Sequence, residues 1–355
     1  MNRNRGAGQN ESAPPLRIDT LSRKHNFAPM RALTRRAFLA TLPPLTAALL
    51  RAADSLPQNK NIKWALSLAL WNYFPPCPFT DILDVMKETG FTGIRLTGFP
   101  GFLQKYNLTK AQLQAELSKR DLQAVTISWN GPLQDPAQKQ QTLDNARTAM
   151  EFLADLGANH LVVFTPGREK PGGTTPEGFK ELCDRCNQIG EIAHGLGFTA
   201  GVHNHWGQMV QSREEVDRFM AMTDPKLFGF SPDTAHLNLA GCNVVDTLDR
   251  YKDRIRFLDY KDSKWTTPTA DVVQASGAGQ KKAILPKDSA SAKFFSSIYD
   301  LGDGEVDFPG CHRVLKSINY RGWICVDLDT ARQGPLASYQ HCGAYIRSKL
   351  EPIYA

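Results

Sequence analysis

The sequence has no apolar run long enough to span a membrane as a helix. Its most apolar stretch, TRRAFLATLPPLTAALL at 34–50, is short and is interrupted by Pro43 and Pro44. No other segment comes closer to the required length. The sequence therefore predicts no membrane insertion of the processed chain.

Two motif classes are also missing. The seven cysteines are an odd number, and Cys183 and Cys186 form a single CxxC without a second pair at zinc-site spacing, so we expect ordinary thiols. No Gly-rich phosphate-binding fingerprint follows the first apolar run. That absence argues against a dinucleotide-binding domain.

The folded part of the chain lacks an excess of basic residues. The formal net charge is +6, but residues 1–53 hold nine Lys or Arg and two Asp or Glu. The remaining residues hold 33 basic and 34 acidic side chains. A nearly neutral domain gives no reason to expect nucleic-acid binding.

The basic N-terminal segment has the order of features found in an export signal. Arg35 and Arg36 precede Phe38 and Leu39, and the apolar stretch ends in RAAD at 51–54. The pattern resembles a twin-arginine signal over residues 1–53, cleaved near Ala53, with Met30 as an alternative start. It predicts export to the periplasm. A disordered basic tail is the alternative.

From residue 60 onward, short apolar runs alternate with amphipathic helical patterns, several of which end on glycine. Eight such units favour a single (β/α)₈ TIM barrel over residues 60–350, of α/β class, although a doubly wound sheet is the rival. The eight runs expected to form strands are Trp64–Trp71, Gly93–Thr97, Ala124–Trp129, His160–Thr165, Thr199–His203, Phe228–Ser231, Arg256–Tyr260 and Trp323–Leu328.

One connection is unusually long. Residues 262–307 follow the seventh predicted strand and contain polar and Gly-rich stretches with a short helical segment. In a barrel this loop would lie over the catalytic face, as a lid or a substrate contact. A plain surface insertion is the alternative.

Acidic and imidazole side chains gather where the last four predicted strands end. Because active sites of TIM barrels lie at the carboxyl ends of the strands, these residues should converge. One histidine and three carboxylates would suit a divalent cation with mixed nitrogen and oxygen ligands. The residues are His203 and His205, then Asp233 and His236, then Asp259, Lys261 and Asp262, then Asp327 and Asp329.

Each of these residues also has a simpler interpretation. Asp233 could cap the following helix, Asp262 could pair with Lys261, and a histidine at a strand end is often just a hydrogen-bonded polar residue. Three tryptophans could stack on sugar faces or pack in the core: Trp71, Trp129 and Trp206.

The motifs resemble those of a known superfamily. HNHWGQMVQSREEVDRFMAMTDP, DTAHL, DRYKDRI and YKD resemble inosose dehydratases, and LGDGEVDFPGCHRVLKSINYRGWICVDLD resembles a C-terminal signature of sugar isomerases and epimerases. The chain from about 62 to 350 thus resembles the xylose-isomerase-like TIM barrel superfamily.

The resemblance implies a metal site formed by His203, Asp233, Asp259 and Asp327. Asp259 stands where the family usually has His, and Asp327 stands where it usually has Glu. The implied cofactor is a divalent ion, with Mn²⁺ as the first expectation and Mg²⁺, Co²⁺ or Zn²⁺ as alternatives.

The implied reaction is proton transfer next to the carbonyl of a free or keto sugar through an enediolate, as in an isomerase or epimerase. His205, His236 and Lys261 are the candidates for acid, base or substrate-orienting roles. Elimination by a dehydratase or lyase at the same site is the alternative, and a sugar-binding barrel without catalysis is another. The oligomeric state stays open.

Overall fold

The computed structural model describes residues 61–168, 174–275 and 282–354. The predicted leader at 1–53 lies outside them. Within the described residues, no helix has both the length and the apolarity needed to cross a membrane.

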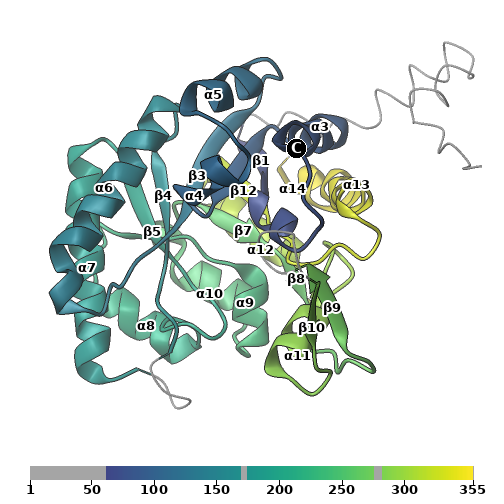
Figure 1. Cartoon of the computed structure of the whole chain (residues 1–355). Coiled ribbons are helices and arrows are strands. Elements are labelled where there is room, and N and C mark those ends of the chain that lie inside the picture. The colour runs from purple at the N-terminus through teal and green to yellow at the C-terminus, as the bar shows by residue number, and fades with distance from the viewer. Residues whose placement is uncertain (1–60, 169–173, 276–281, 355) are drawn as a thin grey trace, which may run out of the picture. The chain divides into compact units, whose positions relative to one another are not determined.

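Eight parallel strands form one sheet in the order β6-β5-β4-β3-β2-β1-β12-β7 (Figure 1). Single bridges between Phe230 and Ile255 and between Asp233 and Asp259 join β6 to β7 and close the barrel. The predicted TIM barrel is confirmed, and each of the eight predicted runs contributes a strand. They are β1 (Ile62–Ser67), β2 (Gly93–Thr97), β3 (Gln123–Asn130), β4 (His160–Phe164), β5 (Thr199–His203), β6 (Gly229–Phe230), β7 (Leu258–Tyr260) and β12 (Gly322–Val326).

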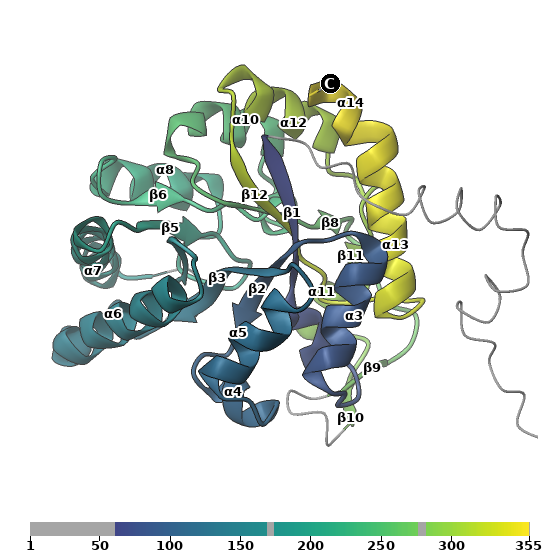
Figure 2. The same ribbon diagram turned by 90° about the horizontal axis from the view of Figure 1, so that it is seen from above.

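Helices follow the strands and cover their outer side (Figure 2). The α-helices are α3 (Phe79–Thr89), α4 (Gly101–Lys105), α5 (Lys110–Ser118), α6 (Lys139–Asp155), α7 (Pro176–Gly195), α8 (Arg213–Met222), α9 (Thr234–Leu239), α10 (Val244–Arg250), α11 (Ala290–Ser296), α12 (Phe308–Ser317), α13 (Pro335–Tyr345) and α14 (Glu351–Tyr354). Shorter 3₁₀ turns are η1 (Leu68–Asn72), η2 (Pro136–Gln138) and η3 (Lys252–Arg254), and η4 (Ile346–Leu350) is a π-helix.

Local sequence explains where several helices begin. Ser212 and Glu215 form a capping box at the start of α8, in which each side chain accepts from the other residue's backbone N–H. Asp233 caps α9 by accepting from the backbone N–H of His236 at 3.0 Å. The first turn of α9 is therefore tied to the end of β6.

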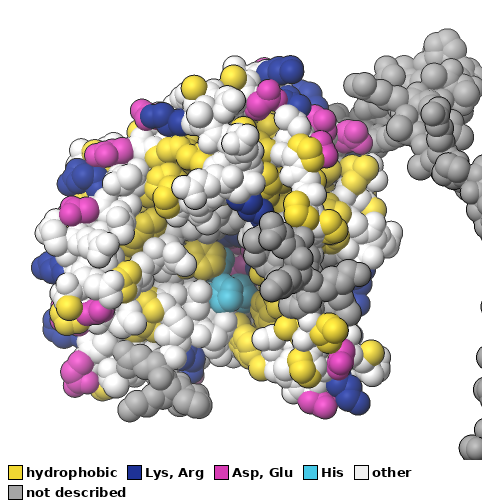
Figure 3. Space-filling model, in the orientation of Figure 1, with side chains coloured by type: hydrophobic (Ala, Val, Ile, Leu, Met, Phe, Trp, Pro, Cys, Tyr) yellow, Lys and Arg dark blue, Asp and Glu magenta, His cyan; other side chains and the backbone are white. Residues whose placement is uncertain are grey.

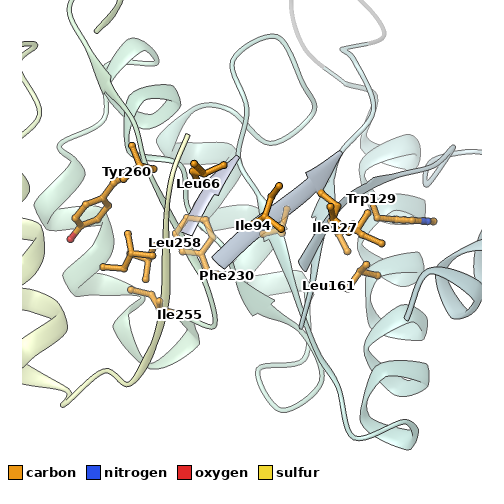
Figure 4. Close-up of a cluster of buried hydrophobic side chains, with 14 of the residues drawn as sticks. Leu66, Ile94, Ile127, Trp129, Leu161, Phe230, Ile255, Leu258 and Tyr260 are labelled. Carbon is orange, nitrogen blue, oxygen red and sulfur yellow. The ribbon is translucent and has the colours of Figure 1, made fainter. Parts of the chain in front are cut away.

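The core has two layers that follow from the alternation of side chains along each strand. Outward-facing residues pack between the strands and helices, including Leu66, Ile94, Ile127 and Leu161 (Figure 4). Inside the barrel, a smaller cluster fills the middle of the interior: Ala65, Val125, Val162, Phe257 and Cys325. Two residues after Phe257 and Cys325, the next inward positions are Asp259 on β7 and Asp327 just after β12.

The long connection at 262–307 contains secondary structure of its own. β8 (Asp262–Ser263) pairs antiparallel with β11 (Ile298–Tyr299), and β9 (Val272–Ala275) pairs with β10 (Lys282–Leu285). The Asp262 carboxylate accepts backbone N–H groups of Gly302, Gly304 and Val306 at 2.9, 2.9 and 3.1 Å. Asp262 thus fastens the end of the connection to its beginning.

Candidate active site

Polar side chains converge at the carboxyl ends of the barrel strands. His203, Asp233, Asp259 and Asp327 are all between 0 and 2% exposed. Their contacts link neighbouring strands: His203 Nδ1 lies 3.1 Å from Asp259 Oδ2, and its Nε2 lies 4.0 Å from Asp233 Oδ2. The structure brings the predicted residues together in one buried cluster.

Three of the site residues form a tight group of potential metal ligands. One ligand atom each from His203, Asp233 and His236 lies within 4.8 Å of the others, and His236 Nε2 is 3.9 Å from Asp233 Oδ2. Neither Asp259 nor Asp327 belongs to this group. Among the described residues, His203 Nε2 and His236 Nδ1 have no hydrogen-bond partner, whereas Asp233 Oδ2 contacts Lys261 Nζ at 3.2 Å.

The two carboxylate oxygens of Asp233 have different environments. Oδ1 accepts the backbone N–H of His236 at 3.0 Å, and the backbone N–H of Asp233 donates to Asn204 Oδ1 at 3.0 Å. These bonds fix the side chain and leave Oδ2 facing the cluster. Asp233 is therefore both the helix cap and a site residue.

Neighbouring rings fix the two histidines of the group. The Phe164 ring stacks on His203 with centroids 4.0 Å apart, and Phe164 is its register partner on β4. The His236 ring contacts both His205, with centroids 3.7 Å apart, and Phe294 of α11, at 5.5 Å and nearly parallel. The long connection thus contributes a wall of the site.

Arg95 is the main site residue that the sequence analysis missed. It lies in the middle of β2, is 1% exposed, and donates from Nη1 to Asp259 Oδ2 at 2.6 Å. Its Nη2 lies 2.7 Å from Asp327 Oδ1. The available signal in the sequence was a single basic residue within an otherwise apolar strand. Because a buried cation requires partners, such a residue indicates acidic side chains nearby.

Lys261 contributes a second buried cation. Its Nζ lies 2.6 Å from Asp327 Oδ2, 2.9 Å from Asp329 Oδ2 and 3.2 Å from Asp233 Oδ2. It also lies 3.4 Å from His236 Nε2. Burial lowers the pKa of Lys261, but the surrounding carboxylates outweigh burial and raise the pKa well above its usual value.

The carboxylates differ in their titration. Burial raises the pKa of Asp233 to about 7, with Lys261 opposing the shift. Burial likewise raises the pKa of Asp259 to about 7 against the effect of Arg95. Burial also disfavours ionised Asp327, but Arg95 and Lys261 together hold its pKa well below the usual range. Asp327 is therefore the most firmly ionised member of the three.

The imidazoles are neutral. Burial, followed by nearby positive groups, lowers the pKa of His203 and His236 well below 6.5. Burial lowers the pKa of His205 to about 3. Neutral imidazoles offer lone pairs to an ion or a proton, which is the state that metal ligation requires.

The predicted sugar-stacking tryptophans lie in different surroundings. Trp71 and Trp129 are each 5% exposed and belong to the main hydrophobic core. Trp206 is partly exposed and stacks on Phe294 with centroids 5.7 Å apart. A stacking role for these side chains stays a prediction, and Trp206 is the one that lies beside the site.

A cavity of about 390 Å³ opens next to the cluster. Tyr73, Phe74 and Phe295 supply aromatic walls, and Asp329 and Arg332 supply charged groups. Figure 3 shows a histidine surface in a hollow of the molecule. Asp329 lines the cavity and also contacts Lys261, so one residue bound to the buried cluster forms part of the cavity wall.

The chain is similar to proteins of one known family. The model of the xylose isomerase-like TIM barrel family matches residues 83–348. The chain belongs to the xylose isomerase-like TIM barrel family. An inosose dehydratase from Clostridium beijerinckii is 28% identical over 288 residues, covering 76% of this chain and 93% of that protein. These relatives indicate that this chain is an enzyme of the same superfamily.

Solved structures of the family show the same fold. The 3-keto-D-glucoside 4-epimerase YcjR from E. coli has a TM-score of 0.59 and 18% identity, covering 82% of this chain and 100% of that chain. The IOLI protein, solved with a bound zinc atom, has a TM-score of 0.57 and 14% identity, covering 82% and 96%.

The donor set of this chain fits a divalent ion. Zinc bonds to imidazole nitrogen and carboxylate oxygen are about 2.0–2.2 Å long, so donors sharing one ion lie roughly 3–4 Å apart. The Asp233 oxygen lies 4.0 and 3.9 Å from the Nε2 atoms of His203 and His236. Buried imidazole and carboxylate donors at these separations are able to hold a metal, with Lys261 Nζ as the present neighbour of Asp233 Oδ2 and His236 Nε2.

Proposed function

We propose that this chain is a divalent-metal-dependent enzyme that removes a proton from the carbon next to the carbonyl of a keto sugar or cyclic keto polyol. The observation that carries the proposal is the His203–Asp233–His236 group, set among buried carboxylates and Lys261 beside a cavity. Its family membership and its inosose dehydratase relatives support the same chemistry.

His203 and Asp233 would hold the ion, which would polarise a substrate carbonyl and stabilise negative charge on its oxygen. The chain itself supplies the remaining functions. The caps and hydrogen bonds around Asp233 fix its carboxylate, and Phe164 fixes the ring of His203. Such preorganised groups need little rearrangement during reaction.

Asp329 and Lys261 are the proposed proton-transfer pair. Burial raises the pKa of Asp329, which brings a carboxylate nearer to the pH at which a base works well. Asp329 lines the cavity and lies 2.9 Å from Lys261 Nζ. Asp329 would take the proton from carbon, and Lys261 would give a proton to the departing hydroxyl or to a substrate oxygen. His205 would orient the substrate.

Elimination is the outcome that the inosose dehydratase relatives favour. The C–H electron pair forms a carbon–carbon double bond as the neighbouring C–O bond breaks, and the hydroxyl leaves as water. Epimerisation is the second candidate, favoured by the fold shared with a keto-glucoside epimerase. In that case the proton returns to the opposite face of the same carbon.

We also propose that the protein is exported to the periplasm. The twin-arginine-type pattern at 34–54 supports this location. Sugar phosphates are mainly cytosolic, so an exported enzyme would act on unphosphorylated keto sugars. Sequencing the N-terminus of protein recovered from the periplasm should find a start near residue 54, whereas full-length protein confined to the cytosol contradicts the proposal.

A substrate panel tests the reaction. Metal-loaded protein is incubated with cyclic keto polyols and 3-keto glycosides, and products are followed by ultraviolet absorption and NMR. An absorbing unsaturated ketone indicates elimination, and a new stereoisomer without absorbance indicates epimerisation. Binding of these ketones without any turnover in metal-loaded protein would support a sugar-binding barrel instead.

A further inference from the structure

Arg95 separates the aspartates at this site into two groups. Its guanidinium, wholly buried, spans Asp259 Oδ2 at 2.6 Å and Asp327 Oδ1 at 2.7 Å. A metal ion bound to either oxygen would lie beside a fixed positive charge in a buried setting, where like charges repel strongly. Arg95 therefore opposes coordination through Asp259 Oδ2 and Asp327 Oδ1.

His236 is available in their place. It lies one helical turn after Asp233 on α9, so its ring and the Asp233 carboxylate project from the same turn. Its Nε2 is 3.9 Å from Asp233 Oδ2, while its Nδ1 has no hydrogen-bond partner among the described residues. Packing against His205 and Phe294 fixes the ring.

We infer that the ligands of the ion are His203, Asp233 and His236, and that Asp259 and Asp327 serve as partners of Arg95 instead. This inference rests on the proposed metal-dependent function and replaces the four-residue set with a two-histidine, one-carboxylate set. Nitrogen-rich sets suit Zn²⁺, Co²⁺ or Fe²⁺, whereas oxygen-rich sets suit Mn²⁺ and Mg²⁺. The expected resident ion therefore shifts away from Mn²⁺.

The surrounding charges allow a dication at this position. The four carboxylates of Asp233, Asp259, Asp327 and Asp329 face only the two cations Arg95 and Lys261 within the described site. When all four are ionised, a divalent ion would balance them. Lys261 lies closer to Asp327 and Asp329, at 2.6 and 2.9 Å, than to Asp233 at 3.2 Å. Lys261 Nζ also lies 3.4 Å from His236 Nε2, so a bound ion would displace the ammonium toward its two closer partners, Asp327 and Asp329.

X-ray absorption of the zinc-loaded wild-type protein tests the inference without any substitution. We expect scattering from two imidazole rings. One imidazole with several carboxylate oxygens would overturn the inference and leave the metal-dependent function intact. Failure of the protein to bind zinc, cobalt or manganese at all would contradict both the inference and the proposed function.

Variants give a second readout through the visible spectrum of bound Co²⁺ and through calorimetry. His236→Gln should weaken Co²⁺ binding by more than about 100-fold. Losing a residue that only supports a ligand weakens metal binding by about 10–100-fold, so a larger loss indicates a ligand. His312→Gln is the matched control, because its imidazole is also buried but contacts Trp64 and Tyr260 outside the ligand group, and it should keep the wild-type spectrum.

Asp259→Asn should keep the spectrum with at most about a 10-fold loss of affinity, as expected for a supporting group. Circular dichroism verifies that each variant is folded. A spectrum abolished by Asp259→Asn or Asp327→Asn, but unchanged in His236→Gln, would refute the three-ligand set.

Discussion

Removing the Arg95 guanidinium should destabilise the metal-free protein more than any surface substitution. Arg95→Met keeps an unbranched side chain of similar length but leaves Asp259 without its arginine partner. Asp327 would keep Lys261 at 2.6 Å, so the main loss falls on Asp259. Breaking a buried ion pair by removing one partner costs about 3–5 kcal/mol.

The loss is large compared with a typical unfolding free energy of about 5–15 kcal/mol. Urea unfolding at neutral pH with a chelator present measures it directly. A loss below about 1 kcal/mol, the range of exposed ion pairs, would refute the claim that Arg95 neutralises buried carboxylates.

A double-mutant cycle separates charge from packing. If the cost arises from the unpaired carboxylate, Asp259→Asn should recover part of the stability lost in Arg95→Met. Interaction energies of about 0.5–3 kcal/mol are usual for contacting residues. Additive losses within about 0.5 kcal/mol would show that the two side chains act independently.

Three further predictions concern the scaffold. Burial lowers the pKa of His160 to about 3 from 6.5, so the unfolded chain binds a proton that the folded chain excludes, and stability should fall by about 1.4 kcal/mol per pH unit below 6.5. His160→Gln should unfold with a shallower acid dependence in urea titrations, and an unchanged slope would contradict this. Asp262→Ala removes the acceptor for Gly302, Gly304 and Val306 and should cost about 1–3 kcal/mol, with faster proteolysis of the 262–307 connection as the check. Gly190→Ala would place Cβ 2.6 Å from the Leu227 carbonyl oxygen and should destabilise by about 1–3 kcal/mol, whereas Gly195→Ala, on the same helix without a neighbour within 4 Å, should not.

The barrel could be predicted because its signals are local and repeated. Buried parallel strands read as short apolar runs, and each of the eight runs contributes a strand in the structure. The strand-end residues followed from the rule that active sites of barrels lie at the carboxyl ends. Because successive side chains along a strand point to opposite faces, His203 on β5 and Asp259 on β7 can both point into the barrel interior, where they meet.

The partners of those residues could not be read from the sequence. Arg95 and Asp327 are far apart in the chain, and only the closed sheet brings them within 2.7 Å. The position of His236 depends on how α9 leaves β6, which is fixed by the cap at Asp233. Trp129 was a candidate for sugar stacking but lies in the main hydrophobic core. The sequence does not show on which side of the sheet an aromatic residue at a strand end lies.

Hydrogen exchange at the carbon next to the carbonyl tests the central claim most directly. Zinc- or cobalt-loaded protein is incubated with a cyclic keto polyol in D₂O, and deuterium in recovered substrate and product is measured by mass spectrometry. We expect the wild type to introduce deuterium at that carbon and the His203→Ala/Asp233→Ala double variant to introduce none above the buffer rate. Equal exchange by the folded double variant would place the chemistry elsewhere in the protein.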